Sequence, residues 1–494
     1  MILPRIWAWA LICSAVACKR APAPASETSG SGSAVDQAPP AEPPSEARRV
    51  PAGATSAGLA FPGAEGFGAH ARGGHGGSVC IVRTLAKAGP GSLAACLTAS
   101  GRRTVVFQVA GVIEGPLEIP HGALTIAGES APGPLVVKGG MICDNVYDPN
   151  DCNDVVVRHV RFRGGAPDSF RIGGAHDVIL DHCSFAGAED ENIEITRSRD
   201  VTVQYGVVAE PVGEHYKWGG VLINYSKDVM PLDRIAIHHT VWNGVAGRLP
   251  EVSCEENGDG PGRSNCAGHV LHLELTNNVL WDVSDPVWYN RCVGTNEGND
   301  CAASTPAAKA FRVELNAASN LVARRSSSPV DPILFEPHLL EGPGNRVFAP
   351  GNRVLVGPSA RALTMLGVTA RHAFPQVTVT PVEGLASELQ RRAGAFPRDA
   401  MDARLAGYLS QPVDSRPPAW ARDQGIDRGD AFAVRAVAMR AEDADADGDG
   451  MPDAWEAAHG ARPGVPDASQ PGSCGADYTR LECWLHERAA ALVP

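Results

Sequence analysis

Three short apolar segments begin with the dipeptide Asp-Val at equal intervals along the chain. Val155, Val178 and Val201 head these segments, and consecutive members lie 23 residues apart. A step of this size fits one coil of a parallel β-helix, in which each turn of the chain supplies about three short strands. The sequence therefore predicts an all-β fold built as a right-handed parallel β-helix.

Composition and turn residues support the same fold. The 494 residues include 54 Gly and 39 Pro but only 6% aromatic residues, which suits short strands and tight turns better than long helices. We expect left-handed backbone at four Asn near the predicted turns, namely Asn192, Asn224, Asn278 and Asn320. A β-sandwich or a β-propeller is the alternative, but the apolar segments are short and regularly separated by Asn and Gly.

The two ends of the chain differ from the repeat. Residues 1–18 place an apolar run before Cys18, which predicts a lipoprotein signal peptide, with ordinary signal-peptidase cleavage as the alternative. Residues 19–58 are expected to form a disordered Ala/Pro/Ser-rich linker. We expect the β-helix over 59–362, a flanking segment packed on it over 363–440, and a small calcium-binding helical tail over 441–494. The protein would be extracytoplasmic, either secreted or lipid-anchored to a bacterial outer membrane or cell surface.

Cysteines fall into pairs that are close in sequence. Such pairs are typical of disulfides that staple loops in exported proteins. The predicted pairs are Cys80/Cys96, Cys143/Cys152, Cys254/Cys266, Cys292/Cys301 and Cys474/Cys483. Cys183 is left over within VILDHCSF, and we expect it to be an inert thiol in a buried strand.

Near the C-terminus, DADGDGMPDAWE follows the 12-residue pattern of an EF-hand calcium loop. Its predicted ligands for a structural Ca²⁺ are Asp445, Asp447, Asp449, Asp453 and Glu456. The last residues, YTRLECWLHERAAALV, are expected to form an amphipathic helix.

Acidic residues also recur on the segments between 155 and 250, where Arg248 follows them in Arg-Leu-Pro. Asp168, Asp190 and Glu194 are candidate ligands for a hard cation. Glu189 and Glu191 are the alternatives, because a shift of one residue would exchange them. The net charge of −13 argues against non-specific nucleic-acid binding and requires any site for a polyanion to be locally positive.

Several motifs in this order resemble the pectate lyase family (polysaccharide lyase family 1) over roughly residues 59–360. They are AFPGAEGFGA, GPGSLAAC, VVFQVAGVI, LTIAGESAPG, VVVRHVRFRGG, VILDHCSF and HHTVWNGVAGRLP. The resemblance implies an enzyme that cleaves polygalacturonate, an acidic polysaccharide, by Ca²⁺-assisted β-elimination, and we expect the protein to be a monomer. It also implies that Asp168, Asp190 and Glu194 bind the catalytic Ca²⁺, that Arg248 takes the proton, and that Lys217 binds a substrate carboxylate.

The chain departs from the family pattern in ways that leave its exact uronate substrate open. Ser253 stands where a second Arg is usual, and Ala166 where an Asp is usual. A pectin lyase that acts on methyl esters is one alternative, although the retained carboxylates favour a calcium-dependent enzyme. A non-catalytic β-helix that binds surface polysaccharide is another, and it would be favoured if Arg248 pointed away from the carboxylates.

Two further groups of charged residues lie on predicted strands. Asp181 and His182 are expected to form a buried network that holds the strand, in preference to a catalytic pair. Arg158, Arg161 and Arg163 are expected either to face a substrate cleft or to lie exposed on the surface of a sheet.

Overall fold

The structure is a computed structural model, and it describes part of the chain. The described residues are 58–146, 150–212, 219–254, 268–283, 287–290, 311–327, 339, 344–356, 359–362, 367–415 and 430–494. The predicted signal peptide with Cys18, most of the predicted linker and Lys217 lie outside them. Residues 55–494 form one compact unit.

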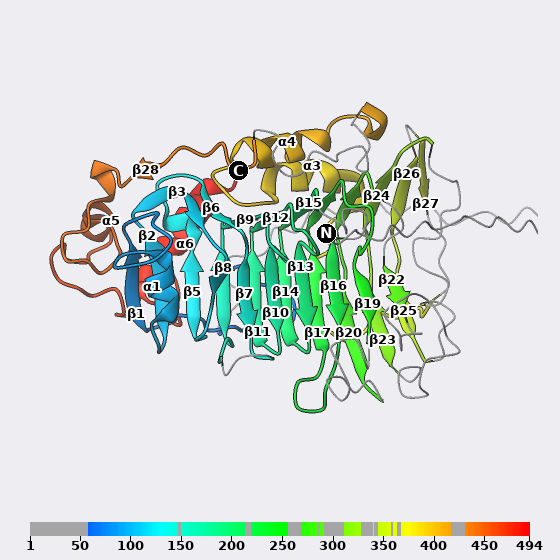
Figure 1. Cartoon of the computed structure of the whole chain (residues 1–494), viewed down its shortest axis with the longest axis horizontal. Helices are drawn as coiled ribbons and strands as arrows, with labels where there is room; N and C mark the ends of the chain where they lie inside the picture. The colour runs from blue at the N-terminus through cyan, green and yellow to red at the C-terminus, as the bar shows by residue number, and fades with distance from the viewer. Residues whose placement is uncertain are drawn as a thin grey trace, which may run out of the picture. The chain divides into compact units, whose positions relative to one another are not determined.

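From β2 (Arg103–Phe107) to β24 (Leu321–Arg324), successive strands visit three sheets in turn, so each set of three strands makes one coil (Figure 1). Strand β8 (Val155–Arg158) lies in the first sheet, β9 (Arg161–Arg163) in the third and β10 (Phe170–Gly173) in the second. Val178 of β11 pairs in parallel with both Val155 and Val201. The 23-residue step is therefore one coil, and the predicted parallel β-helix is confirmed.

The remaining elements have the following bounds. The first sheet contains β1 (Ser78–Val82), β2 (Arg103–Phe107), β5 (Leu124–Ala127), β8, β11 (His176–Asp181), β14 (Arg199–Gln204), β17 (Asp233–His238), β20 (Val270–Glu274), β23 (Arg312–Asn316) and β25 (Arg346–Phe348). The second contains β4 (Leu117–Glu118), β7 (Met141–Asp144), β10, β13 (Ile193–Thr196), β16 (Val221–Asn224), β19 (Glu251–Ser253) and β22 (Trp288–Asn290). The third contains β28 (Val437–Ala438), β3 (Val109–Glu114), β6 (Leu135–Lys138), β9, β12 (Ser184–Ala186), β15 (Val207–Ala209), β18 (Val241–Asn243), β21 (Val279–Trp281), β24 (Leu321–Arg324), β26 (Arg353–Val356) and β27 (Ser359–Ala362). The described helices are α1 (Leu93–Thr98), α3 (Val382–Arg392), α4 (Ala400–Tyr408), α5 (Asp453–Ala458) and α6 (Arg480–Leu492), with 3₁₀ turns η1 (Gly128–Ser130), η3 (Val413–Ser415) and η5 (Ala441–Asp443).

The core lies between the three sheets, where apolar side chains stack from coil to coil. Phe162 and Phe185 occupy equivalent places on neighbouring coils, with their rings stacked and 5.5 Å apart between centroids. Phe170 meets both rings edge-on. All three are fully buried, and burial of such a side chain stabilises the fold by about 1.5–3 kcal/mol.

The turns differ from expectation. The left-handed positions are occupied not by the four predicted Asn but by residues such as Asp154, Asp177, Asp200, His159 and His182. That prediction is wrong because the Asn amides bond to the backbone between coils. For example, Asn278 accepts a hydrogen bond from the Thr240 N–H, and Asn320 accepts one from the Asn278 N–H.

Helices α3 and α4 cover the outer face of the third sheet (Figure 1). Beneath them, buried Arg161 and Arg163 reach the carboxylate of Asp402 at 2.8 and 2.5 Å. Arg158 is also buried and pairs with Glu129 at 2.9 Å. Both expectations for these three arginines are therefore wrong. The later helix α4 covers Arg161 and Arg163 on the third sheet, and the earlier residues Phe61 and Glu129 cover Arg158 on the first sheet.

The C-terminal segment packs on the first coils. Leu481 and Leu485 of α6 join Ile81 of β1 and Val106 of β2 in one buried cluster. Buried Leu481, Leu485 and Ala489 recur every four residues and define one apolar side of α6, which confirms the predicted amphipathic helix.

Covalent links follow the predicted pattern where the structure describes them. The disulfides Cys80–Cys96, Cys143–Cys152 and Cys474–Cys483 are present. The pairs Cys254/Cys266 and Cys292/Cys301 include residues outside the described part of the chain. Cys183 is a buried free thiol whose pKa is raised by burial, as expected for an inert cysteine. Among the described helices, none is both long and apolar enough to span a membrane.

Candidate catalytic site

Three carboxylates meet where the chain enters the second sheet. Asp168 precedes β10, Glu191 precedes β13, and Glu194 lies within β13. Glu191 follows Asp168 by 23 residues, and its N–H donates to Asp168 Oδ1 at 3.1 Å. One oxygen from each of the three carboxylates lies within 4.8 Å of the others. The coil repeat thus stacks equivalent positions and brings acidic groups together.

Burial makes this carboxylate group electrostatically unfavourable when it is ionised. It raises the pKa of Asp168 to about 6. The pKa of Glu194 is raised well above its ordinary value, first by burial and then by the negative charge of Asp168. Asp168 Oδ2 is buried without a hydrogen-bond donor among the described residues. Carboxylate oxygens are ligands that Ca²⁺ binds in proteins, so a group of three that includes an oxygen without a donor fits this ion.

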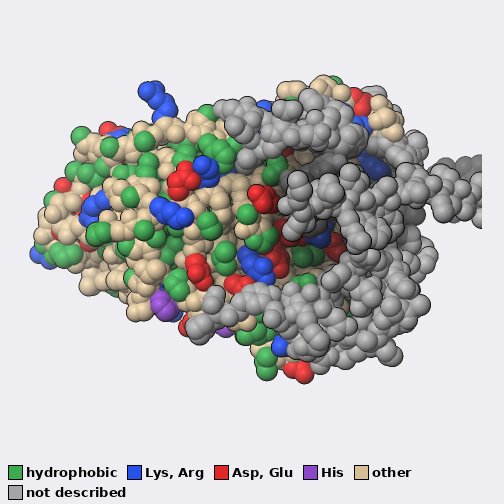
Figure 2. Space-filling model, viewed as in Figure 1, with side chains coloured by type: hydrophobic (Ala, Val, Ile, Leu, Met, Phe, Trp, Pro, Cys, Tyr) green, Lys and Arg blue, Asp and Glu red, His purple; other side chains and the backbone are tan. Residues whose placement is uncertain are grey.

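Arg171 lies among the same carboxylates and is the positive charge closest to them in the second sheet. It pairs with Glu194 in register, and its guanidinium is 3.0 Å from Glu194 and 2.8 Å from Asp144. Figure 2 shows acidic and basic side chains gathered on this face of the molecule. The site therefore contains positive charge among its carboxylates, but the carboxylates are in excess, as they are over the whole chain with its net charge of −13.

Arg248 points toward the carboxylates and not away from them. Its guanidinium forms ion pairs with Glu191, with Asp190 at 3.3 Å and with Glu251 at 2.9 Å. The residue has a left-handed backbone with φ of 53°, a conformation rare for residues other than Gly. This backbone geometry, at the turn before β19, places the guanidinium beside the acidic group.

The structure brings most of the predicted site residues together, with one change. Asp168 and Glu194 belong to the carboxylate group, whereas Asp190 lies beside it and contacts Arg248. Glu191, the alternative in the sequence, takes the third place in the group. Glu251 and Arg171 were not singled out as site residues. For Arg171 a signal was available, since it precedes Glu194 by the same 23-residue step.

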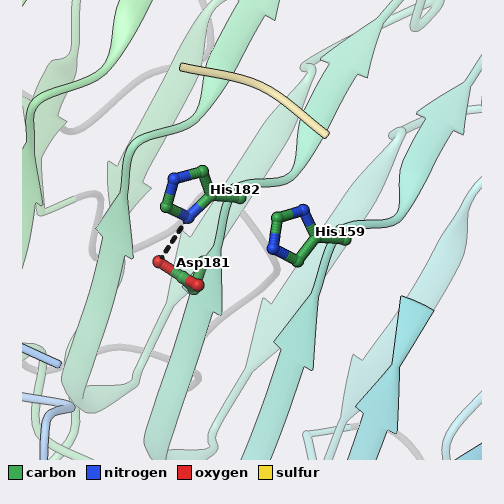
Figure 3. A group of neighbouring side chains, drawn as sticks. All are labelled: His159, Asp181 and His182. Carbon is green, nitrogen blue, oxygen red and sulfur yellow. Dashed lines mark hydrogen bonds and ion pairs between the residues drawn. The ribbon is translucent and has the colours of Figure 1, made fainter. Parts of the chain in front are cut away.

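Asp181 and His182 lie in a different, buried network on the far side of β11 from the core (Figure 3). His182 Nδ1 lies 2.9 Å from Asp181 Oδ1, and its ring stacks on those of His159 and Tyr205 on the neighbouring coils. Arg158 reaches the other Asp181 oxygen at 3.0 Å. Histidine and Arg158 charges hold the pKa of Asp181 far below its usual range despite burial. These contacts match the predicted structural network.

The C-terminal loop also gathers carboxylates. Asp445, Asp447 and Asp449 form one group of close oxygens, and Asp449, Glu456 and Asp467 form a second. Asp453 belongs to neither; its Oδ1 accepts a hydrogen bond from the Ala446 N–H at 2.9 Å. Asp467 lies outside the EF-hand pattern, so the sequence did not identify it.

Comparison with known proteins finds similarity to pectate lyases over part of the chain. The fold and site describe a parallel β-helix that carries a carboxylate–arginine centre. No protein-family model matches the chain. Over 112 residues, it is 44% identical to the "Probable pectate lyase C" of Aspergillus flavus, covering 22% of this chain and 26% of that protein. The protein of the same name from Emericella nidulans is 43% identical over 113 residues, which are 22% of this chain and 25% of that protein. These relatives confirm the resemblance to pectate lyases that the motifs indicate, and the chain spans about a quarter of their length.

Solved structures of the same kind are also similar. A pectate lyase bound to a hexasaccharide aligns with a TM-score of 0.45 and 13% identity, over 67% of this chain and 96% of that one. A pectate lyase from Bacillus sp. N165 in complex with trigalacturonate aligns with a TM-score of 0.43 and 14% identity, over 67% and 98%.

Proposed function

We propose that the protein is a pectate lyase that cleaves polygalacturonate by Ca²⁺-assisted β-elimination. The observation that carries the proposal is the guanidinium of Arg248 beside the buried carboxylates of Asp168, Glu191 and Glu194. A hydrolase would need two carboxylates that flank the scissile bond. A compact acidic group with an adjoining arginine fits a bound cation and an anionic substrate better.

The reaction removes the proton at C5 of a uronate and expels the glycosidic oxygen at C4. Bound Ca²⁺ would supply the positive charge that neutralises the uronate carboxylate and makes the C5 proton more acidic. Asp168, Glu194 and either Glu191 or Asp190 would hold the ion. Glu191 is the better placed of the two, because its oxygen lies within the buried group.

The arginines of the site would act on the substrate itself. Arg171 would bind the uronate carboxylate, since a guanidinium presents paired donors to a carboxylate. Arg248 would take the C5 proton, a role carried over from the family resemblance. Its present partners Asp190, Glu191 and Glu251 hold it in place, so substrate binding must rearrange these contacts. Lys217 is proposed as a second group that binds substrate carboxylate.

The other functions considered fit less well. A pectin lyase acting on methyl esters has no need of the buried carboxylates at Asp168 and Glu194. An Arg248 that pointed away from the carboxylates would have favoured a β-helix that only binds polysaccharide. Arg248 instead contacts the carboxylates of Asp190 and Glu191.

We propose further that the protein is exported and acts as a monomer. The three described disulfides support export, because such bonds persist in oxidising compartments. The two relatives described are fungal, so they give no support to a bacterial lipid anchor at Cys18.

The test is an assay of the purified protein on polygalacturonate, with added Ca²⁺ or with EDTA. We expect ultraviolet absorbance from the unsaturated product only with Ca²⁺. Arg248→Lys should abolish this signal, whereas Arg83→Lys, a change at an exposed arginine, should leave it intact. Absence of product from both polygalacturonate and methylated pectin would reject a lyase function, and full activity of Arg248→Lys would reject the assigned base.

A further inference from the structure

The C-terminal loop and the segment after it contain buried carboxylate oxygens that have no hydrogen-bond partner among the described residues. Glu456 is fully buried, and neither of its oxygens has a hydrogen-bond partner in the described structure. Asp447 Oδ2 and Asp467 Oδ1 are buried and unpartnered as well. Arg480 pairs with the other oxygen of Asp467, but no described side chain forms an ion pair with Glu456. Because burial of an unpaired carboxylate is strongly unfavourable, Glu456 requires a further positive charge at this place.

Asp449 connects the two groups of carboxylates and also orders the backbone around them. Its Oδ1 accepts a hydrogen bond from the Met451 N–H at 3.1 Å. Its Oδ2 accepts from the N–H groups of Asp467 and Ala468, both at 2.9 Å. The loop that begins at Asp445 is thereby tied to the segment that carries Asp467.

The same segment supplies the side chains that attach the tail to the solenoid. Met451 and Ala468 pack in one cluster with Ile81 of β1, Val106 of β2 and Leu481 of α6. The Cβ that a side chain would add at Gly450 would lie 2.8 Å from Val79, so the loop itself presses on β1.

Polar contacts extend this attachment around the first coils. Glu482 of α6 lies 3.0 Å from His75. Arg488 donates to the Glu129 carbonyl at 3.2 Å. Strand β28 pairs with β3, the next-to-outermost strand of the third sheet. These contacts lie outside the loop, whereas Met451 and Ala468 both bond to Asp449 and pack against the first coils, so they couple the fold of the loop to the docking of the tail.

We propose that a Ca²⁺ ion bound by Asp447, Asp449, Glu456 and Asp467 acts as a clasp that fastens the C-terminal tail to the first coils of the β-helix. Compared with the set of ligands expected from the EF-hand pattern, Asp467 replaces Asp453. Asp445 is left out, because both of its oxygens accept hydrogen bonds from backbone N–H groups of the loop. Loss of the ion leaves like charges buried together, so the loop opens, and residues 445–494 detach from β1 and β2. The clasp is separate from catalysis and does not depend on the proposed lyase function.

The test uses the full chain with Glu194→Gln, which removes the proposed catalytic ion, so that calorimetric titration with Ca²⁺ reports on the tail. We expect one Ca²⁺ site, and Asp467→Asn and Glu456→Gln should each lower its affinity for Ca²⁺ at least tenfold. Asp453→Asn is the matched control, since Asn retains the Oδ1 that accepts from Ala446, and its affinity should stay within about twofold. Absence of binding, or weakening by Asp453→Asn alone, would overturn the set of ligands.

The docking of the C-terminal tail is measured by hydrogen exchange of the backbone amides of the same protein, in Ca²⁺ and in EGTA. Chelation should speed exchange in α6 and in β1 and β2 together, while β11 and β14 stay protected. Exchange that rises in residues 445–468 alone, with α6 and β1 unchanged, would show a local calcium loop and no clasp. Because neither measurement uses activity, failure of the lyase proposal would not affect them.

Discussion

Replacement of Asp168 by Asn should change the stability of the protein in opposite directions with and without Ca²⁺. Asn keeps the Oδ1 that accepts the Glu191 N–H and removes one negative charge from the buried group. In the cation-free protein this relieves repulsion with Glu194, and in the loaded protein it removes a ligand.

The magnitude follows from the perturbed carboxyl group. Burial raises the pKa of Asp168 from 3.8 to about 6, and two pKa units correspond to roughly 3 kcal/mol. The folded protein then binds the proton more tightly than the unfolded chain. The free energy of unfolding without Ca²⁺ should therefore fall as the pH rises from about 4 to about 6, and stay low above that.

Urea unfolding followed by circular dichroism, in EDTA and in Ca²⁺, measures both effects. In EDTA at pH 8, Asp168→Asn should be more stable than the parent by up to about 3 kcal/mol and should lack the fall between pH 4 and 6. At a Ca²⁺ concentration 100 times the dissociation constant, the parent should gain about 2.7 kcal/mol from this site, and the variant should lose that gain. Both proteins retain the C-terminal site, so their difference isolates the catalytic one.

Asp190→Asn is the matched control, because Asp190 is about a third exposed and lies outside the buried group. It should change stability in EDTA by less than about 1 kcal/mol. If Asp168→Asn destabilised the protein equally in EDTA and in Ca²⁺, the carboxylate would be a structural hydrogen-bonding group, and the assigned cation site would be wrong.

Three further predictions concern the scaffold. Asp402→Ala leaves Arg161 and Arg163 buried without their closest carboxylate, so urea unfolding should show a loss of about 3–5 kcal/mol in the free energy of unfolding. The control Glu442→Ala, at an exposed ion pair, should lose less than about 1 kcal/mol. Equal losses for the two variants would contradict a role for the buried ion pairs in stability. Phe162→Ala removes a fully buried ring from the stack of the core and should destabilise the fold by about 3–5 kcal/mol; a loss below 1 kcal/mol would mean that the neighbouring coils repack. The thiol of Cys183, buried and with a raised pKa, should react with a thiol reagent only after denaturation, and rapid labelling of the native protein would contradict its assignment as inert.

The coil repeat shows how far sequence reasoning reached. The step between Val155, Val178 and Val201 gave the register of the first sheet, because parallel strands on successive coils pair residue by residue. The same step, applied to the acidic residues, leads from Asp168 to Glu191. The match of Asp190 to the family pattern did not identify Glu191 as the third carboxylate, because a comparison of motifs does not record which residues stack between coils.

The C-terminal loop illustrates a different limit. Its pattern predicted a calcium site, and the structure gathers four of the five expected carboxylates in two adjoining groups. Asp453 instead accepts a backbone hydrogen bond, and Asp467 takes part from beyond the loop. A pattern of fixed spacing cannot include a residue that only chain folding brings near.

Local spacing in the sequence determined the coil period, the close disulfide pairs and which segments carry the acidic residues, because these depend on neighbours within about one turn of the solenoid. The tertiary structure decided which charges are buried and what each one contacts. Arg163 meets Asp402 from 239 residues away, and its burial exists only because α4 covers the third sheet. Periodicity tells whether a side chain points into or out of a coil, but whether an outward face meets water or another segment depends on packing between distant parts of the chain.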